Sequence, residues 1–442
     1  MFTLRALALA ACMLSLSTAH AAVSLLGVGS LPANATDLSG LTGTLESGVA
    51  KNLLSVGSGL AYTGQGSRYI AVPDRGPNAN PYNTAVDDTT SFQARMHEID
   101  ITISGSTVTP TVARTTLFSN EAGVPLTGLS SGFDATNSSA SIRFDPEGVR
   151  VSRDGQSVFV SDEYGPFVYQ FDRSTGRRIR VLNVPAKFKI VAATSRGSTE
   201  TAGNTSGRIS NRGMEGLAIT PDGNTLVGIM QNPLAQDGGR NGLNIRMLVI
   251  DLASGTSKEL IYPLDNRSYG VNELVAINST EFLAIERDGA AGAAAVAKRV
   301  YKINIAAATD VSAIATLPPT GLPAGTVAAT KSLFLDLLNP AFGLAGASFP
   351  EKIEGLAIGP VLPDGRFTLV VTNDNDFLPA NPNNFYVFAV DRADLTGYVA
   401  QQFDYPPLPP TPTVPTLSSA LLIALMMLLS LSVGDAMRRR KG

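Results

Sequence analysis

Acidic residues stand at matching places in several segments of this 442-residue chain. In four segments a glutamate stands at the start of an apolar run, and this first set is Glu147, Glu215, Glu273 and Glu354. In four segments a carboxylate ends the next apolar run, and this second set is Asp74, Glu163, Glu286 and Asp374. If the fold brings them together, their like charges repel and raise each other's pKa values. A hard cation such as Ca²⁺ would neutralise them, because it takes about six to eight oxygen ligands. The residue types therefore predict a metal site, with Ca²⁺ as its ion.

Basic side chains stand next to these acidic residues in the sequence. They are Arg75, Arg212, Arg287 and Lys352. Cationic side chains together with a metal are a common way to hold phosphate, so we expect these residues to bind substrate oxygens. The catalytic candidates are Glu147, Glu163, Glu215, Arg212 and Arg287. A structural alternative also accounts for the pattern, because each Glu-Gly pair would cap backbone N–H groups between neighbouring segments.

Strands must position these side chains. The clearest segment, residues 145–172, is typical of strands at 148–152, 157–161 and 167–171, with a turn at Arg153-Asp154-Gly155. Alternating Val, Phe and Tyr favour pleated structure, and Asp-Gly between two such runs is a strong hairpin signal. The two ends of a hairpin lie side by side, so Glu147 and Glu163 are expected to be neighbours.

Variants of this segment recur and predict the fold. The two positions that are acidic in most segments recur at similar intervals. The interval is 16 residues in three segments: Glu147 to Glu163, Glu215 to Gln231 and Ser58 to Asp74. It is 13 residues from Glu273 to Glu286 and 20 from Glu354 to Asp374. Repetition of a four-stranded unit every 60–90 residues is typical of an all-β β-propeller, in which equivalent positions meet around one axis. We predict five blades, with six as an alternative, and a ring closed by the N-terminal strand at 23–28.

Composition excludes several functional classes. The chain has 34 Lys and Arg against 37 Asp and Glu and lacks a basic stripe with interleaved aromatics, so no nucleic-acid partner is expected. Cys12 and His20 fall in a predicted leader, which leaves His97 as the only histidine of the mature chain. His97 falls within a predicted strand away from the motif loops, so a Ser-His-Asp triad is not expected. Zinc is disfavoured for the same lack of His and Cys.

Both ends of the chain resemble targeting segments. Residues 1–21 are typical of a secretory signal peptide ending at Ala19-His20-Ala21, with a lipoprotein signal at Cys12 as the alternative. The propeller is expected over residues 22–404 and a Pro-rich linker over 405–416. Residues 417–434 are apolar and just long enough to span a bilayer, and basic residues follow at 438–441. We predict a transmembrane or sorting tail over 417–442 and an exported protein, held at the membrane or cell surface or released after processing.

That tail resembles the sorting tails of exosortase-processed bacterial proteins, the IPTL-CTERM and PEP-CTERM class. The resemblance rests on Val414-Pro415-Thr416-Leu417-Ser418, the apolar run and the terminal arginines. It implies a processing enzyme as a partner. The chain departs from the pattern with Val414 where Ile is usual and with Ser419-Ala420 where an acidic-aromatic pair is typical. A plain membrane anchor is the alternative.

The body of the chain resembles the phytase-like family, which is described by an esterase-like activity of phytase. The resemblance rests on ordered motifs: DPEG at 145–148, SDE at 161–163, NRGMEGL at 211–217, ERD at 286–288, IEGL at 353–356 and NDNDF at 373–377. It implies a propeller and a hydrolase of phosphoric esters. The chain departs from the pattern at Gln231-Asn232, where an acidic residue is common, and at Asn373, where Ser is common. These departures put metal ligation by two blades in question.

Three hypotheses about function follow. The first is a metal-dependent hydrolase of small phosphoric esters. The second is a non-catalytic binding or envelope propeller in which a cation only joins the blades. The third is a lactonase-like metal propeller, which would hydrolyse lactones and leave phosphoric esters intact.

Overall fold

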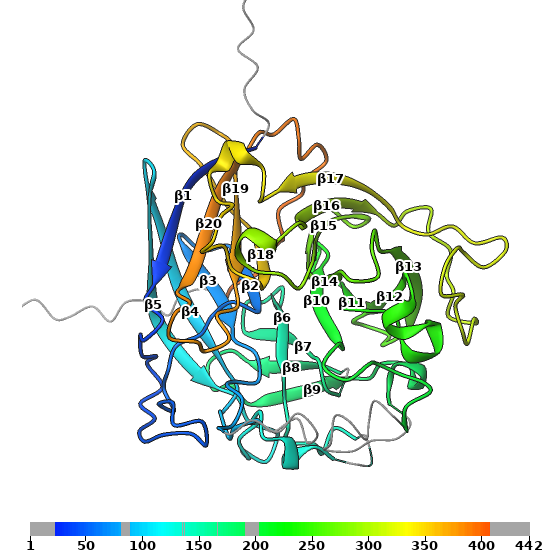
Figure 1. Cartoon of the computed structure of the whole chain (residues 1–442), viewed down its shortest axis with the longest axis horizontal. Coiled ribbons are helices and arrows are strands. Elements are labelled where there is room, and N and C mark those ends of the chain that lie inside the picture. Colours follow the sequence, from blue (N-terminus) through cyan, green and yellow to red (C-terminus); the bar gives the residue numbers. More distant parts are fainter. Residues whose placement is uncertain are drawn as a thin grey trace, which may run out of the picture. The chain divides into compact units, whose positions relative to one another are not determined.

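The computed structural model describes residues 23–80, 89–134, 136, 138–165, 167–190 and 203–406. The chain divides into two compact units at Asp404, and all the strands described below belong to the first. That unit contains five antiparallel sheets of four strands each, arranged as blades around a central axis (Figure 1). The predicted all-β propeller is confirmed, with five blades in the described part of the chain.

Each blade runs from an inner strand at the axis to an outer strand at the rim. The inner strands are β2 (Gly59–Tyr62), β6 (Pro146–Val151), β10 (Met214–Ile219), β14 (Gly270–Ala276) and β18 (Ile353–Val361). The second strands are β3 (Arg68–Val72), β7 (Ser157–Asp162), β11 (Thr225–Met230), β15 (Glu281–Arg287) and β19 (Phe367–Asn373). The third strands are β4 (Arg95–Ser104), β8 (Val168–Asp172), β12 (Asn244–Asp251), β16 (Lys298–Asn304) and β20 (Asn383–Val390). The outer strands are β5 (Thr107–Leu117), β9 (Arg178–Leu182), β13 (Ser257–Pro263), β17 (Thr330–Asp336) and β1 (Val23–Leu31).

The position of a strand in its blade explains its composition. Inner and second strands have blades packed on both faces, so β6, β7, β10 and β19 are buried along their whole length. At the rim, β5 alternates buried and exposed residues over its first half, as a strand with one solvated face does. The largest apolar clusters lie between neighbouring blades, one joining β10 to β14 and another joining β18 to β15.

The Asp-Gly turns behave as the sequence predicts. Gly155, Gly223 and Gly365 all adopt positive φ, at 70°, 73° and 89°, where a side chain would be strained. In the first turn the carboxylate of Asp154 accepts hydrogen bonds from Ser152 Oγ and Gln156 N. Such side-chain-to-backbone bonds hold a tight turn without help from the rest of the fold.

The ring closes across the two ends of the first unit. Strand β1 pairs antiparallel with β20, from Val23 opposite Val390 to Leu31 opposite Asn383 (Figure 1). The N-terminal segment thus supplies the outer strand of the fifth blade, which confirms the predicted closure. Strand β17 was not predicted, because residues 305–329 separate it from its partner β16.

Six short 3-10 helices connect the strands in the described residues: η1 (Ser130–Gly132), η2 (Ala186–Phe188), η3 (Ala235–Asp237), η4 (Gly239–Asn241), η5 (Gly292–Ala294) and η6 (Pro340–Phe342). Of the residues that the structure describes, none lies in a helix long and apolar enough to cross a membrane. The predicted signal peptide, the tail at 417–442 and most of the Pro-rich linker lie outside the described residues.

Candidate active site at the acidic mouth

A β-bulge at the start of the inner strand aims one side chain of each of four blades toward the axis. The pairing of inner and second strands shifts between Pro146 and Val149, between Met214 and Gly216, between Val271 and Glu273, and between Ile353 and Leu356. The residues in these shifts that line the central cavity are Glu147, Glu215, Asn272 and Glu354. Bulges re-aim side chains in this way next to active sites in other folds.

A second set of side chains follows the ends of the second strands. These residues are Asp74, Glu163, Gln231, Arg287 and Asp374, one from each blade. Both sets lie at the same end of the channel, because the inner and second strands of a blade are antiparallel. The arrangement is the one expected from the repeat.

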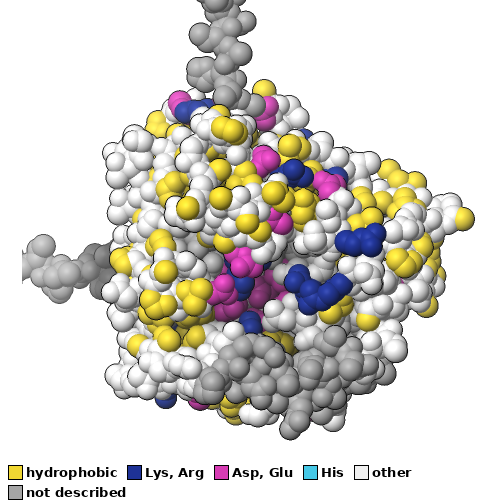
Figure 2. All heavy atoms as spheres, in the orientation of Figure 1, with side chains coloured by type: hydrophobic (Ala, Val, Ile, Leu, Met, Phe, Trp, Pro, Cys, Tyr) yellow, Lys and Arg dark blue, Asp and Glu magenta, His cyan; other side chains and the backbone are white. Residues whose placement is uncertain are grey.

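The two sets line a cavity of about 190 Å³ at one mouth of the channel, here called the acidic mouth. Figure 2 shows it as a hollow near the centre of the face in view, with acidic and basic side chains side by side. Seven carboxylates line it: Asp74, Glu147, Glu163, Glu215, Glu351, Glu354 and Asp374. Four cationic side chains join them, namely Arg75, Arg212, Arg287 and Lys352. The structure thus brings ten of the twelve predicted site residues to one cavity.

Glu273 and Glu286 are the two predicted residues that the structure places elsewhere. The Glu273 carboxylate lies behind the cavity, 3.0 Å from Arg150 Nη2, and accepts hydrogen bonds from the backbone N of Leu217 and Leu274. The Glu286 carboxylate accepts hydrogen bonds from Tyr262 Oη and Lys331 Nζ, each at 2.6 Å.

Both predictions are wrong because the sequence alignment of the fourth blade is shifted by one residue from the strand pairing that the structure shows. The bulge there falls between Val271 and Glu273, so Asn272 is the residue equivalent to Glu215. Val271 pairs with Glu286, which makes the following residue, Arg287, the equivalent of Glu163. A shift of one residue turns a strand side chain to the opposite face. The fourth blade therefore brings an amide and a guanidinium to the mouth where the sequence predicted two carboxylates.

Three of the cationic side chains are near carboxylates of the mouth. Arg287 Nη2 lies 2.5 Å from Glu354 Oε1, and Arg75 Nη1 lies 3.5 Å from Asp74 Oδ2. Lys352 Nζ lies 2.8 Å from Asp374 Oδ2 and 2.5 Å from Asp376 Oδ1. The short contacts of Arg287 with Glu354 and of Lys352 with Asp374 and Asp376 neutralise part of the negative charge of the mouth.

Arg212 differs from these three. Its Nη1 donates hydrogen bonds of 2.9 Å to Gln231 Oε1 and to Asn232 Oδ1, both uncharged amides. No carboxylate of the described residues lies within ion-pair distance of it. Burial and the positive charge of Arg240 lower the pKa of Arg212. With Gln231 and Asn232 beside it, the departures noted in the sequence, Arg212 has no carboxylate at ion-pair distance in the described part of the chain, and the charges of Glu163 and Glu215 act on it from farther away.

Two groups of three carboxylates are close enough to share a metal ion. Asp145, Glu147 and Glu163 form one group, and Asp74, Asp374 and Asp376 form the other. Within each group, one oxygen atom per residue lies within 4.8 Å of the other two. Asp145 and Asp376 were not predicted as site residues, although Asp145 opens the same motif as Glu147 and Asp376 ends the run at 373–376. Oxygen-only donor sets of this kind suit hard cations.

Burial and like charge hold protons on part of this set. Burial, with the negative charge of Glu163, raises the pKa of Asp145 to about 7. Burial, with the charge of Glu215, raises the pKa of Glu147 well above its usual range. Burial and the negative charge of Glu163 raise the pKa of Glu215 in the same way. Strongly raised carboxyl pKa values in a cavity are typical of functional sites.

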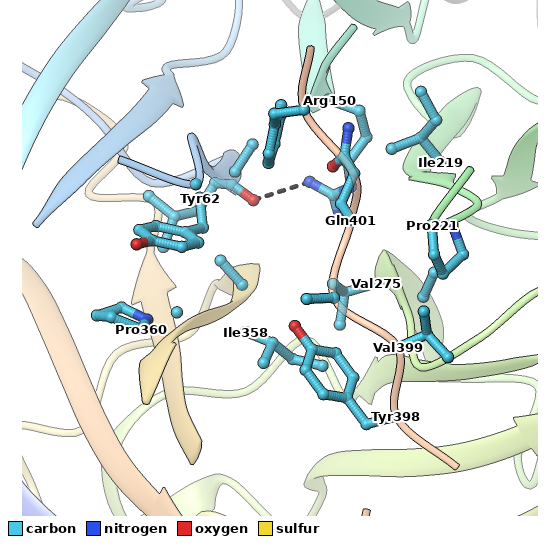
Figure 3. A pocket seen from close by; sticks show the side chains of 18 of the residues that line it. Tyr62, Arg150, Ile219, Pro221, Val275, Ile358, Pro360, Tyr398, Val399 and Gln401 are labelled. Atoms are coloured by element: carbon cyan, nitrogen blue, oxygen red, sulfur yellow. Dashed lines mark hydrogen bonds between the residues drawn. The ribbon is translucent and has the colours of Figure 1, made fainter. Parts of the chain in front are cut away.

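The other end of the channel, here called the apolar mouth, has a different lining. It opens into a cavity of about 350 Å³ among Tyr62, Ile219, Val275 and Ile358, side chains at the far ends of the inner strands (Figure 3). The segment from Tyr398 to Phe403 runs along one side of it and is held by hydrogen bonds from Val399 N to Ile277 O and from Gln401 Nε2 to Val151 O.

Arg150 and Glu273 form an ion pair beside the apolar mouth. Arg150 reaches toward the axis and donates from Nη1 to Leu60 O at 2.8 Å, the bond drawn in Figure 3. Its Nη2 is paired with Glu273, and both side chains are buried.

His97 plays no part at the acidic mouth. It lies in β4, fully buried, with Nδ1 3.0 Å from Thr115 Oγ1. Burial lowers its pKa to about 3, so it is neutral at ordinary pH. The expectation that this histidine is not a catalytic base agrees with its place in the fold.

Fold and site together define a five-bladed propeller with a carboxylate-rich channel mouth. Residues 54–377 match the model of the family described as "Phytase-like: Esterase-like activity of phytase". The chain belongs to this phytase-like family. A relative from Arthroderma benhamiae, named an uncharacterized secreted protein, is 27% identical over 454 residues, covering 80% of this chain and 86% of that protein.

Solved structures resemble the chain only distantly. Glutaminyl cyclase from Myxococcus xanthus has a TM-score of 0.34 at 11% identity, covering 83% of this chain and 97% of that one. Hydrazine synthase from Kuenenia stuttgartiensis has a TM-score of 0.32 at 12% identity, covering 76% and 80%. Likenesses at this level carry no argument about function.

Proposed function

We propose that the chain is an exported hydrolase of phosphoric esters that uses a divalent cation, with Ca²⁺ the first candidate, at the acidic mouth. Membership of the phytase-like family supports the reaction class, and the secreted relative supports export. The observation that carries the proposal is Arg212, a cationic side chain in a cavity of carboxylates with no carboxylate at ion-pair distance among the described residues.

Charge explains why a cation is needed. Seven carboxylates face four cationic side chains in the cavity, so once these carboxylates are ionised they would repel an ester with two negative charges unless a cation offsets them. Asp145, Glu147 and Glu163, or Asp74, Asp374 and Asp376, offer the oxygen donors to hold a hard cation. When bound, it would supply Lewis-acid polarisation of a phosphoryl oxygen and a more acidic water.

The protein's own residues would do the rest. Arg212 can donate to two phosphoryl oxygens, because a guanidinium presents its N–H groups in a fork that matches phosphate. Arg75 and Arg287 lie in the same cavity and would add positive charge to the substrate side. Glu215 is buried between Glu163 and Asn272 and would donate a proton to the leaving oxygen.

The test is hydrolysis of p-nitrophenyl phosphate and of inositol phosphates by the purified chain, with Ca²⁺ and with a chelator. We expect turnover that chelator abolishes and Ca²⁺ restores. Arg212→Ala should lower kcat/KM about ten- to a hundredfold, the effect of one hydrogen bond to a charged group. Arg240→Ala is the matched control, because Arg240 is exposed, close to Arg212, and not part of the cavity lining. No hydrolysis at any Ca²⁺ concentration would overturn the proposal.

A non-catalytic binding or envelope propeller is the second candidate, and one observation favours it. The pair of Arg287 and Glu354 joins β15 to β18, so groups at the mouth also link two blades. This reading expects chelator to lower the stability of the chain without any turnover. Lactone hydrolysis with no action on phosphoric esters would instead favour the lactonase-like reading. Attachment to the membrane through the tail, a processing enzyme as partner and the lack of a nucleic-acid partner remain part of the proposal.

A further inference from the structure

The two carboxylate groups of the acidic mouth differ in one respect. In the group of Asp74, Asp374 and Asp376, a lysine already lies among the carboxylates. Lys352 Nζ is within 2.8 Å of Asp374 and 2.5 Å of Asp376, the position that a small cation would take. The remaining oxygens of Asp74 and Asp374 accept hydrogen bonds from Gly76 N and Asp376 N. This group, here called the lysine-filled group, is satisfied by the chain itself.

The group of Asp145, Glu147 and Glu163, here called the open group, is not satisfied in this way. Asp145 is fully buried; its Oδ1 accepts a hydrogen bond of 2.7 Å from the backbone N of Arg75, and its Oδ2 has no hydrogen-bond partner among the described residues. Glu147 is 5% exposed, and no hydrogen bond or ion pair of its carboxylate exists within the described residues. Arg75 Nη1 lies 3.9 Å from Asp145 Oδ2. The buried carboxylate of Glu147 therefore has neither a donor nor a counter-ion among the described residues, and such a group is costly unless a ligand compensates it.

An uncharged side chain lining the same cavity points to a ligand as well. Asn272 is 1% exposed, and its Oδ1 has no hydrogen-bond partner in the part of the chain that the structure describes, while its Nδ2 lies 3.3 Å from Glu354 Oε1 and 3.5 Å from Glu215 Oε2. An amide oxygen is a common ligand of hard cations. Oxygen atoms of two chemical types therefore lack donors at this mouth.

The open group is also held in place by a residue outside it. Asp162 Oδ1 accepts hydrogen bonds of 3.1 Å from the backbone N of Asp145 and of Tyr164. The backbone N of Glu163 donates to Asp145 O at 3.1 Å. The carboxylates are thus fixed by a second layer of hydrogen bonds, as groups that ligate metals are.

We propose that the acidic mouth binds a single divalent cation, in the open group, and that Lys352 takes the place of a second cation in the lysine-filled group. This inference deepens the proposed function, because it locates the cation on which that function rests. It predicts a one-metal centre that a single substitution converts to a two-metal centre.

The test is the number of Ca²⁺ ions bound per chain, measured by equilibrium dialysis and elemental analysis of the full chain without substrate. We expect one in the wild type. Glu147→Gln and, as a second variant, Glu163→Gln should weaken binding at least tenfold, and circular dichroism in chelator would verify that both fold. Lys352→Met should raise the number to two, because it frees Asp74, Asp374 and Asp376. Lys331→Met is the matched control, since Lys331 also bridges two carboxylates, Asp265 and Glu286, away from the mouth, and it should leave the number at one.

Two bound ions or none in the wild type would overturn the inference, and so would unchanged binding in both glutamine variants. A number that stays at one in Lys352→Met would overturn the role given to the lysine. These outcomes are independent of catalysis. One bound ion without hydrolysis would sink the proposed function and leave this inference standing.

Discussion

The two mouths of the channel are made by the same five inner strands, yet their chemistry is opposite. At the acidic mouth, bulges and strand ends bring carboxylates and guanidinium groups together in about 190 Å³. At the apolar mouth, the far ends of the same strands carry side chains such as Ile219, Val275 and Ile358. The difference teaches that a propeller blade fixes where a side chain lies, while the residue at the strand end decides what it can do.

The mouths also differ in what stabilises them. Side chains at the apolar mouth need only be packed against each other, so truncation there costs contact area. Charges at the acidic mouth must be paired or neutralised, so removal of one partner leaves another uncompensated. Substitutions of buried charged residues should therefore change the free energy of unfolding more than truncations of apolar residues do, and by an amount that depends more on pH and salt.

The largest effect is expected at the buried ion pair of Arg150 and Glu273 beside the apolar mouth. Glu273→Ala leaves the buried guanidinium of Arg150 without its carboxylate and should lower the free energy of unfolding by about 3–5 kcal/mol. The double variant Arg150→Met with Glu273→Leu should lose less, because it removes both charges from the interior. Urea unfolding of the three proteins measures both. Equal losses in the single and double variants would contradict the role of the pair.

The next effect is a pH dependence that belongs to the acidic mouth. In chelator, the raised pKa of Asp145, about 7, means that the folded state binds a proton that the unfolded state has lost. The stability from this group is complete below its ordinary pKa near 4 and is lost as pH rises toward 7, by about 1.4 kcal/mol per pH unit. Thermal unfolding in chelator should thus show a melting temperature that falls between pH 5 and pH 7.

Substitutions can assign that dependence to one mouth. Asp145→Asn should make it shallower by the share of this one group, with the rest left to carboxylates such as Glu147 and Glu215, whose pKa values are also raised. A variant of the apolar mouth such as Gln401→Ala should keep the full dependence. Saturating Ca²⁺ should flatten it, because a bound cation keeps the carboxylates ionised. If the slope is unchanged in Asp145→Asn, it comes from other groups.

A smaller effect is expected at the apolar mouth. Gln401→Ala removes the 2.7 Å hydrogen bond from Nε2 to Val151 O that holds the segment at 398–403. The cost should be about 1 kcal/mol in the free energy of unfolding. Ca²⁺ binding should be unchanged, and calorimetric titration would reveal any coupling between the mouths.

The smallest effect is expected at the surface beside that segment. Arg153 pairs with Asp404 at 2.6 Å, but the two side chains are 41% and 64% exposed. Arg153→Ala should therefore change the free energy of unfolding by less than about 1 kcal/mol, and added salt should remove the difference. Urea unfolding at low and high salt measures this. A larger loss would mean that the pair contributes more to stability than its exposed position predicts.

Much of the fold was predictable because its signals are local. Asp-Gly turns and alternating apolar residues mark the hairpins around Gly155 and Gly223, and the closing strand β1 is a plain apolar run. Strand β17 was not predicted because a long insertion precedes it and its apolar residues, Leu333, Phe334 and Leu335, follow one another without the usual alternation.

The site was predictable in composition and less so in register. Ten residues gather as expected, but a bulge shifts pairing by one residue and leaves no mark in residue types. A glutamate next to the bulge, Glu273, was therefore taken for the one that Asn272 replaces. Asp145 was overlooked because it stands in only one blade and thus falls outside the repeat.

The pairing of β1 with β20 has a consequence for how the molecule is made. The first strand of the ring, residues 23–31, finds its partner at residues 383–390, after nearly all the other strands have been synthesised. Contacts so distant in sequence slow folding, because loop entropy must be lost before they form. Until then β20 has an unpaired edge, which can recruit other chains. An exported chain of this design must keep its leading strand available during transit, so the last step of its folding belongs to the first residues of its ring.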